Sequence, residues 1–119
     1  LQARLVWLVF AGGAIGSLVR GFITAFGADL LSTLIVNVLG AAILGLIQHA
    51  PHFDGEAKQA FFATGFCGGF TTLSGVALFA VLGGADFAVT IGYIALTVVA
   101  SVAAYALWAY LGKSFRNGY

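Results

Sequence analysis

A polar segment over residues 64–76 lies inside an apolar stretch long enough to cross a membrane. It reads TGFCGGFTTLSGV, so glycines, threonines and a serine stand where apolar side chains are expected. Glycine loosens a helix, and hydroxyl groups can bond the backbone groups that a break sets free. Lipid offers no such bonds, so a break at this depth must be covered by protein or line a watery path. The segment is therefore the strongest pointer to function in the chain.

Asn37 and Thr33 bring an amide and a hydroxyl into the preceding apolar stretch. They are four residues apart and would share one face of a helix, which the small residues Ala41 and Gly45 continue at steps of four. An asparagine buried in a membrane often only joins two helices by a hydrogen bond. Asn37 therefore has two interpretations, a joint between helices and a donor to a solute.

A second polar stripe follows in the last apolar stretch, where Tyr93, Thr97, Ser101 and Tyr105 stand at steps of four. The line drifts by about 40° per step at 3.6 residues per turn, but it remains one stripe. Hydroxyl groups in membrane helices also bond their own backbone, which is the simpler interpretation of each residue alone. Two stripes beside a broken third stretch favour a shared polar track.

Arg20 is a cation inside the first apolar stretch, whereas Asp29, Asp54, Glu56 and Asp86 lie in loops or at the ends of stretches. Its side chain either reaches the membrane surface or has a buried structural or electrostatic role. Proton-coupled export of cationic drugs generally needs an acid within the membrane, so a small multidrug transporter is disfavoured. Amide and hydroxyl donors beside an arginine suit a small anion.

The composition is that of an integral membrane protein with little mass outside the bilayer. Hydrophobic residues make up 61% of the chain and charged residues 8%, and the mean hydropathy is +1.06. The net charge of +1 argues against a nucleic-acid partner. One cysteine excludes an internal disulfide, and the spacing of cysteine, histidines and acids matches no metal motif. We expect residues 1–119 to form a single domain.

Four membrane-spanning helices are predicted, over about residues 5–26, 30–49, 60–82 and 87–111. Each would be roughly 30–37 Å long, which suits a hydrocarbon core of about 30 Å. We expect an all-α fold whose third helix is broken at mid-membrane near Gly68–Thr71. Four short spans cannot easily enclose a pore alone, so an oligomer is also expected.

The loops have a charge bias that predicts the orientation. Even connectivity puts Arg4, Lys58, Lys113 and Arg116 on one side, and the turns on the other side hold no Lys or Arg. Positively charged loops face the cytoplasm in most membrane proteins. We therefore expect a multi-pass protein of the inner (plasma) membrane with both termini in the cytoplasm.

Three segments together resemble the CrcB/Fluc family of fluoride channels, small four-helix proteins that pair as antiparallel dimers. They are GGAIGSLVR at 12–20, TLIVNVLG at 33–40 and GFCGGFTT at 65–72, and the likeness covers essentially the whole chain. The resemblance implies a channel and no enzyme. Such a channel exports cytoplasmic fluoride down its electrochemical gradient, without ATP or a coupled ion.

The resemblance also implies roles for individual residues. The backbone carbonyls of Gly68 and Thr71 from both subunits would hold a structural sodium ion, Na+, at the dimer interface. Asn37 would donate to the permeating anion, and Arg20 matches the first-helix arginine of the family. The anion path predicted from the stripes and the resemblance consists of Thr33, Asn37, Thr72, Ser74, Tyr93, Thr97 and Ser101.

The chain departs from the family at two phenylalanine positions of the third helix, where Leu73 and Val76 stand instead. In relatives the positive ring edges face fluoride, so restoring phenylalanine at both positions is expected to raise fluoride flux. The loop charge bias is a second departure, because a subunit that inserts both ways should have little bias. Both facts suit one half of a heterodimer with a sister chain, in a weakly conducting or structural role, and they also suit a diverged channel made of two copies.

Overall fold

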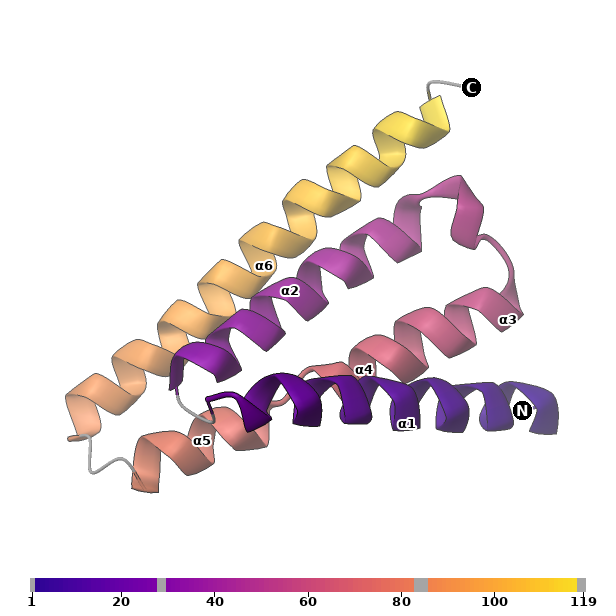
Figure 1. The fold of residues 1–119 in the computed structure, drawn as a ribbon. Coiled ribbons are helices and arrows are strands. Elements are labelled where there is room, and N and C mark those ends of the chain that lie inside the picture. The colour runs from indigo at the N-terminus through magenta and orange to yellow at the C-terminus, as the bar shows by residue number, and fades with distance from the viewer. Residues whose placement is uncertain (1, 28–29, 83–85, 118–119) are drawn as a thin grey trace.

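Four long helical spans make up the chain in the computed structural model, which describes residues 2–27, 30–82 and 86–117 (Figure 1). Within these ranges, Ala3–Ala25, Leu31–His49, Glu56–Leu78 and Phe87–Arg116 are long and apolar enough to cross a membrane. Their mean hydropathies lie between 1.4 and 2.1, and no strand occurs among the described residues. The predicted all-α membrane fold with four spans is confirmed.

The third span is built from several short elements, whereas the other three are single helices. In chain order the elements are α1 (Ala3–Ala25), α2 (Leu30–His49), the 3₁₀ turn η1 (Pro51–Phe53), α3 (Glu56–Lys58), the π-helical η2 (Gln59–Cys67), α4 (Gly68–Phe70), α5 (Leu73–Leu82) and α6 (Phe87–Asn117). Thr71 and Thr72 lie between α4 and α5, outside any helix.

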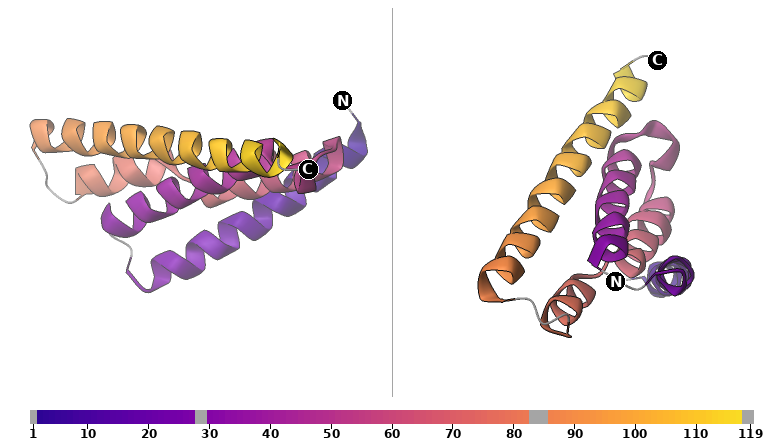
Figure 2. Two further views of the ribbon diagram at one scale, coloured as in Figure 1. Left: turned by 90° about the horizontal axis from the view of Figure 1, so that it is seen from above. Right: turned by 60° about the vertical axis from the view of Figure 1, so that its left-hand side comes forward.

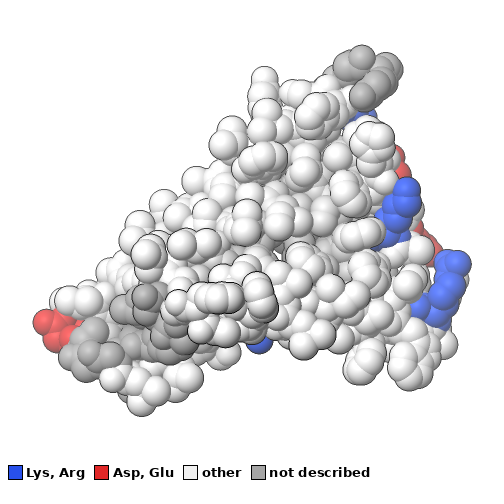
Figure 3. All heavy atoms as spheres, viewed as in Figure 1, with Lys and Arg blue, Asp and Glu red and all other residues white. Residues whose placement is uncertain are grey.

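The helices are arranged as two pairs that meet in the middle of the molecule. α1 packs along η2 and α4, and α6 packs along α2. The two turned views place α1 and α6 on opposite sides, with α2 and the third span between them (Figure 2). Most of the basic side chains in view gather at the end of the molecule that carries η1 and α3 (Figure 3). This is the end expected from the loop charge bias.

The two largest differences from the predicted element boundaries both lie at this basic end. The third span begins at Glu56 rather than near residue 60, and α6 runs on to Asn117 rather than ending at Leu111. Gly112 lies inside α6 and against the backbone of Ala50 and His49, where an added Cβ would be only 3.1–3.2 Å away. The close approach brings the last turn of α6 to the loop that follows α2.

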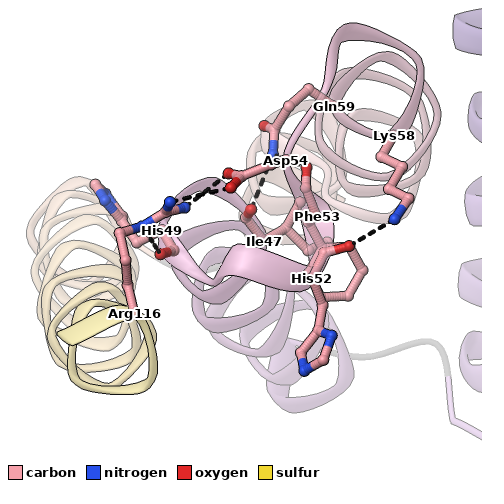
Figure 4. Close-up of polar contacts among 8 residues, drawn as sticks. All are labelled: Ile47, His49, His52, Phe53, Asp54, Lys58, Gln59 and Arg116. Carbon is pink, nitrogen blue, oxygen red and sulfur yellow. Dashed lines mark hydrogen bonds and ion pairs between the residues drawn. The ribbon is translucent and has the colours of Figure 1, made fainter. Parts of the chain in front are cut away.

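Side chains join that loop to the neighbouring helices (Figure 4). Arg116 forms a two-pronged ion pair with Asp54, with Nη–Oδ distances of 2.7 and 3.0 Å, and its Nε donates to the His49 carbonyl at 3.2 Å. The hydrogen bond from Arg116 holds the pKa of the Asp54 carboxyl below its usual value. Gln59 donates from Nε2 to the carbonyls of Ile47 (2.9 Å) and Phe53 (2.8 Å). The loop between α2 and the third span is therefore bonded to α6 on one side and to the third span on the other.

The predicted turns on the opposite side fall partly on residues 28–29 and 83–85, which lie outside the described residues. Asp86, at the start of α6, is described. Its Oδ1 accepts a hydrogen bond from the Val89 N–H at 2.9 Å. It therefore caps the helix N-terminus, as an acid at that position commonly does.

Glycines allow α1 to lie directly against the third span. A Cβ added at Gly12, Gly16, Gly65 or Gly69 would come closer than 3.0 Å to a backbone oxygen of the facing helix. Real Cβ atoms essentially never approach so closely. The backbones of α1 and the third span are therefore in contact at these glycines.

Replacing Gly16 by alanine should push α1 away from the third span, because the new Cβ would meet the backbone oxygen of Phe66. We expect Gly16→Ala to lower the free energy of unfolding by about 1–3 kcal/mol, the usual range for overpacking. Thermal unfolding in detergent measures the change. Gly21→Ala on the same helix is the matched control, since no atom lies within 4 Å of its added Cβ. Equal stability of the two variants would contradict the close contact.

Candidate functional site

The helix interruption at Thr71 and Thr72 is the centre of the candidate site. Thr71 leaves the helical conformation with φ −87° and ψ 156°, while Gly68, Gly69 and Phe70 remain helical. The Thr72 hydroxyl then accepts a hydrogen bond from the Gly75 N–H at 3.0 Å and so caps the new helix α5. The chain thus turns at the threonines, at the C-terminal edge of the segment in which the sequence predicted a break.

The side chain of Asn37 binds the freed backbone of Thr72 from α2. Its Nδ2 donates to the Thr72 carbonyl at 2.8 Å, and its Oδ1 accepts from the Thr72 N–H at 2.7 Å. Asn37 is only 8% exposed. One amide therefore supplies both a donor and an acceptor where the helix ladder is missing. This is a joint between two spans, and it uses one of the two N–H groups that an asparagine amide carries.

Helix α1 supports the same interruption with two further side chains. Arg20 donates from Nη1 to the Thr71 carbonyl at 3.2 Å, and the Ser17 hydroxyl donates to the Gly69 carbonyl at 3.3 Å. Arg20 is half-buried and lies against the third span. Of its two predicted roles, the structural and electrostatic one matches this contact. Its positive charge lies beside the carbonyl oxygen of Thr71.

A cleft of about 600 Å³ opens beside the interruption. It runs between one face of α2, the elements η2 and α4, and α6. Its lining consists of Asn37, Gly40, Ala41, Leu44, Gln48, Ala63, Thr64, Cys67, Gly68, Thr71, Thr72, Leu73, Thr97, Val98, Ser101 and Val102. None of these lining residues is charged.

The cleft brings together four of the residues predicted for the anion path, namely Asn37, Thr72, Thr97 and Ser101. Thr33, Ser74 and Tyr93 do not line it. Thr33 is buried at 1% exposure, and the Ser74 hydroxyl bonds that of Thr72 at 3.1 Å. Tyr93 accepts at its carbonyl from the Thr97 hydroxyl at 2.9 Å.

The hydroxyl of Ser101 is one of the polar groups in the cleft lining that remain available. Its Oγ is buried and has no hydrogen-bond partner within the described part of the chain. Thr97, one turn earlier on α6, satisfies its hydroxyl on its own helix instead. The simpler interpretation of the α6 stripe therefore fits Thr97, whereas Ser101 keeps a donor for a solute or a water molecule.

Gln48 and Thr64 are polar lining residues that the sequence analysis missed. The signal for Gln48 was present, because it follows Asn37 by eleven residues, or about three whole helical turns. Steps of four lead instead to Gly45, which is turned away by about 80°. Gly45 accordingly lies against the backbone of Tyr105 and Ala109 on α6.

The two positions at which the family resemblance implies phenylalanine, residues 73 and 76, have different surroundings. Leu73 is 67% exposed and lines the cleft, whereas Val76 is fully buried within the chain. A phenylalanine ring at position 73 would extend into the cleft. At position 76 it would overpack the interior, which commonly costs about 1–3 kcal/mol. The increase in fluoride flux that was expected from phenylalanine at both positions is therefore expected from position 73 alone.

The carbonyl groups of Gly68 and Thr71, expected to hold sodium, belong to residues that line the cleft. Oxygen ligands suit a hard cation such as Na+. The Thr71 carbonyl already accepts from the Arg20 guanidinium, which leaves it one lone pair. Carbonyl oxygens are therefore suitable ligands for sodium. The two carbonyls of one chain are too few to complete its coordination, so a second subunit would have to supply the others.

Known proteins resemble this chain over nearly its whole length. The family model described as "CrcB-like protein, Camphor Resistance (CrcB)" matches residues 7–112. The protein named "Fluoride-specific ion channel FluC 2" from Synechococcus sp. (strain CC9605) is 38% identical over 118 residues, which cover 98% of this chain and 86% of that protein.

Two further relatives carry the name "Fluoride-specific ion channel FluC". The one from Azobacteroides pseudotrichonymphae is 32% identical, over 94% of this chain and 98% of the relative. The one from Leptospira interrogans (strain Fiocruz L1-130) is 33% identical, over 84% and 87%. The family model matches residues in all four helical spans, and these relatives are similar over most of their length. The chain therefore belongs to the CrcB-like (Fluc) family.

Proposed function

We propose that this chain is a subunit of a fluoride channel through which cytoplasmic fluoride leaves the cell by passive electrodiffusion. The names of its relatives support the choice of ion. The observation that carries the proposal is the uncharged cleft beside the helix interruption, lined by amide and hydroxyl groups. Hydrogen-bond donors without fixed negative charge can replace part of the water shell of a small anion.

Three groups near the interruption can stabilise an anion, two as hydrogen-bond donors and one by its positive charge. The Ser101 hydroxyl has no partner among the described residues, and the Asn37 amide retains a second N–H after bonding the Thr72 carbonyl. Arg20 places a positive charge at the Thr71 carbonyl, next in sequence to the Thr72 carbonyl that Asn37 bonds. Among the lining residues no carboxylate opposes the anion. This arrangement argues against the multidrug transporter, whose cationic substrates require a buried acid.

A second subunit is part of the proposal, because one chain leaves the cleft incompletely covered. Gly68 is exposed on the cleft side, and no atom lies within 4 Å of a Cβ placed on it. We propose that an antiparallel partner packs there, and that the Gly68 and Thr71 carbonyls of both subunits bind a structural Na+. The partner is a second copy or a sister chain; Leu73 and Val76, in place of phenylalanine, suit either one.

The exposed apolar side chains and the basic end of the molecule support a placement in the membrane. We propose a multi-pass protein of the inner (plasma) membrane, surrounded by lipid. Large apolar side chains on α1, α5 and α6 are exposed, among them Phe10, Leu18, Leu82 and Val99. The basic end, with Arg4, Lys58, Lys113 and Arg116, would face the cytoplasm with both termini.

Fluoride efflux from liposomes tests the function directly. Liposomes that hold this chain alone, and then the chain with a sister chain encoded beside it, are loaded with fluoride or with chloride. We expect efflux of fluoride and little efflux of chloride. Efflux that requires the sister chain would favour the heterodimer, with this chain as the partner subunit. No fluoride efflux in either preparation would contradict the proposal.

Asn37→Asp should affect both flux and stability. The carboxylate keeps the acceptor for the Thr72 N–H but places an oxygen against the Thr72 carbonyl and adds a negative charge to the path. We expect fluoride flux to fall by at least about tenfold and the free energy of unfolding by about 1–3 kcal/mol. Efflux assays and thermal unfolding measure the two effects. Unchanged flux would leave Asn37 as a joint between helices only.

Gly68→Ala tests the partner without disturbing the single chain, because the new methyl group meets no atom of its own subunit. We expect the variant to fold but to lose dimer, as seen by light scattering on a size-exclusion column in detergent. Gly92→Ala on α6 is the matched control, since it is equally open within the chain. A dimer fraction equal in both variants would place the subunit contact elsewhere.

A further inference from the structure

Gln48 lies at the far end of the cleft from the helix interruption and is held by α6. Its Oε1 accepts a short hydrogen bond of 2.6 Å from the Tyr105 hydroxyl. The Tyr105 ring packs edge-on against His49, with centroids 6.2 Å apart, and its hydroxyl oxygen lies 3.4 Å from His49 Nε2. Tyr105 therefore has a fixed position from which it orients the Gln48 amide.

This contact determines which end of the amide remains available. Because the oxygen is taken by Tyr105, the Nε2 group is the free end, and it carries two N–H donors. Within the described residues, no other hydrogen bond of the Gln48 side chain is found. Gln48 is exposed and belongs to the cleft lining, so these donors are open to a solute.

The position of Gln48 extends the line of donors along α2. Asn37, Ala41, Leu44 and Gln48 all line the cleft, and the spacings of four, three and four keep them on one helical face. Asn37 and Gln48 are eleven residues apart, or about 16 Å along the axis. α6 contributes the Ser101 hydroxyl, which has no partner within residues 2–27, 30–82 and 86–117 and lies one turn before Tyr105. The cleft thus has amide donors at both ends and a free hydroxyl in its lining.

The cationic side chains that bond the neighbouring loop direct their hydrogen bonds to other groups, so the neutral Gln48 amide is the donor left for a solute there. Arg116 bonds the His49 carbonyl, but its guanidinium is paired with the carboxylate of Asp54. Lys58 directs its ammonium group to the His52 carbonyl at 2.9 Å (Figure 4). An anion at this end of the cleft would therefore find its directed hydrogen bonds at the Gln48 amide.

We infer that Gln48 is a second anion-binding donor, at the end of the path beside the α2–η1 loop, and that Tyr105 is its positioning residue. The inference rests on the proposed fluoride channel. Fluoride that moves along the cleft would exchange water for the Asn37 amide at one end and for the Gln48 amide at the other. Neither Gln48 nor Tyr105 makes the short contacts of α1 with the third span, so both can be changed without disturbing that packing.

Fluoride efflux with Gln48→Glu and Gln48→Leu tests the inference. Gln48→Glu keeps the size and the acceptor for Tyr105 but replaces the donor end by a negative charge, and Gln48→Leu removes the amide. We expect flux to fall about tenfold in Gln48→Glu and severalfold in Gln48→Leu, the scale of one hydrogen bond to a charged group. Gln2→Glu is the matched control, because it adds the same charge near the start of α1, at the basic end but outside the cleft lining.

The role of Tyr105 is tested by Tyr105→Phe in the parent and in Gln48→Leu. We expect the loss of the hydroxyl to lower flux severalfold in the parent and to have no further effect in Gln48→Leu, since Tyr105 would act through the amide. Equal losses in both backgrounds would show that Tyr105 only packs. Parent-like flux in Gln48→Glu and Gln48→Leu would overturn the inference and leave the channel proposal standing, whereas a parent protein without fluoride efflux would overturn both.

Discussion

The bonding of the Thr72 backbone by the Asn37 amide is the interaction on which the rest of the structure depends. An interrupted helix in a membrane leaves N–H and C=O groups that lipid cannot satisfy, and each costs several kcal/mol if left alone. Asn37 satisfies one group of each kind with bonds of 2.7 and 2.8 Å. Because an asparagine amide has a donor and an acceptor side by side, it can pair with a peptide unit much as a neighbouring strand would.

The interruption also needs α1 at backbone distance, and glycine makes that approach possible. Ser17 and Arg20 reach the carbonyls of Gly69 and Thr71 only because α1 lies directly on η2 and α4. Any side chain at Gly12 or Gly16 would separate the two helices and withdraw these donors. The arginine charge is thereby placed beside the Thr71 carbonyl. Packing and electrostatics at the interruption thus have a common origin in the glycine contacts.

The pairing of α2 with α6 positions the hydrogen-bond donors that line the cleft. Gly45 and Gly112 bring these two helices together at the basic end, where Tyr105, Arg116 and Asp54 fix their relative position. Toward the third span the two helices present Asn37, Gln48 and Ser101 to the cleft. A rigid pair of helices can hold hydrogen-bond donors at fixed places, which favours an anion that has to give up water at each step. In the proposed channel, a partner subunit would cover the cleft at Gly68.

The sequence by itself determined the membrane class, the four spans and the segment in which the third span is interrupted. Apolar length, glycine and hydroxyl side chains are local properties, and they act before any helix meets another. The partners of the polar residues were decided by the tertiary structure. Asn37 pairs with Thr72, thirty-five residues away, Arg20 bonds Thr71, and Val76 turns inward while Leu73 lines the cleft. Sequence spacing gives the face of one helix but not the helix that it meets, because the rotation and separation of neighbouring helices depend on contacts such as those of Gly16 and Gly45, which form only in the folded chain.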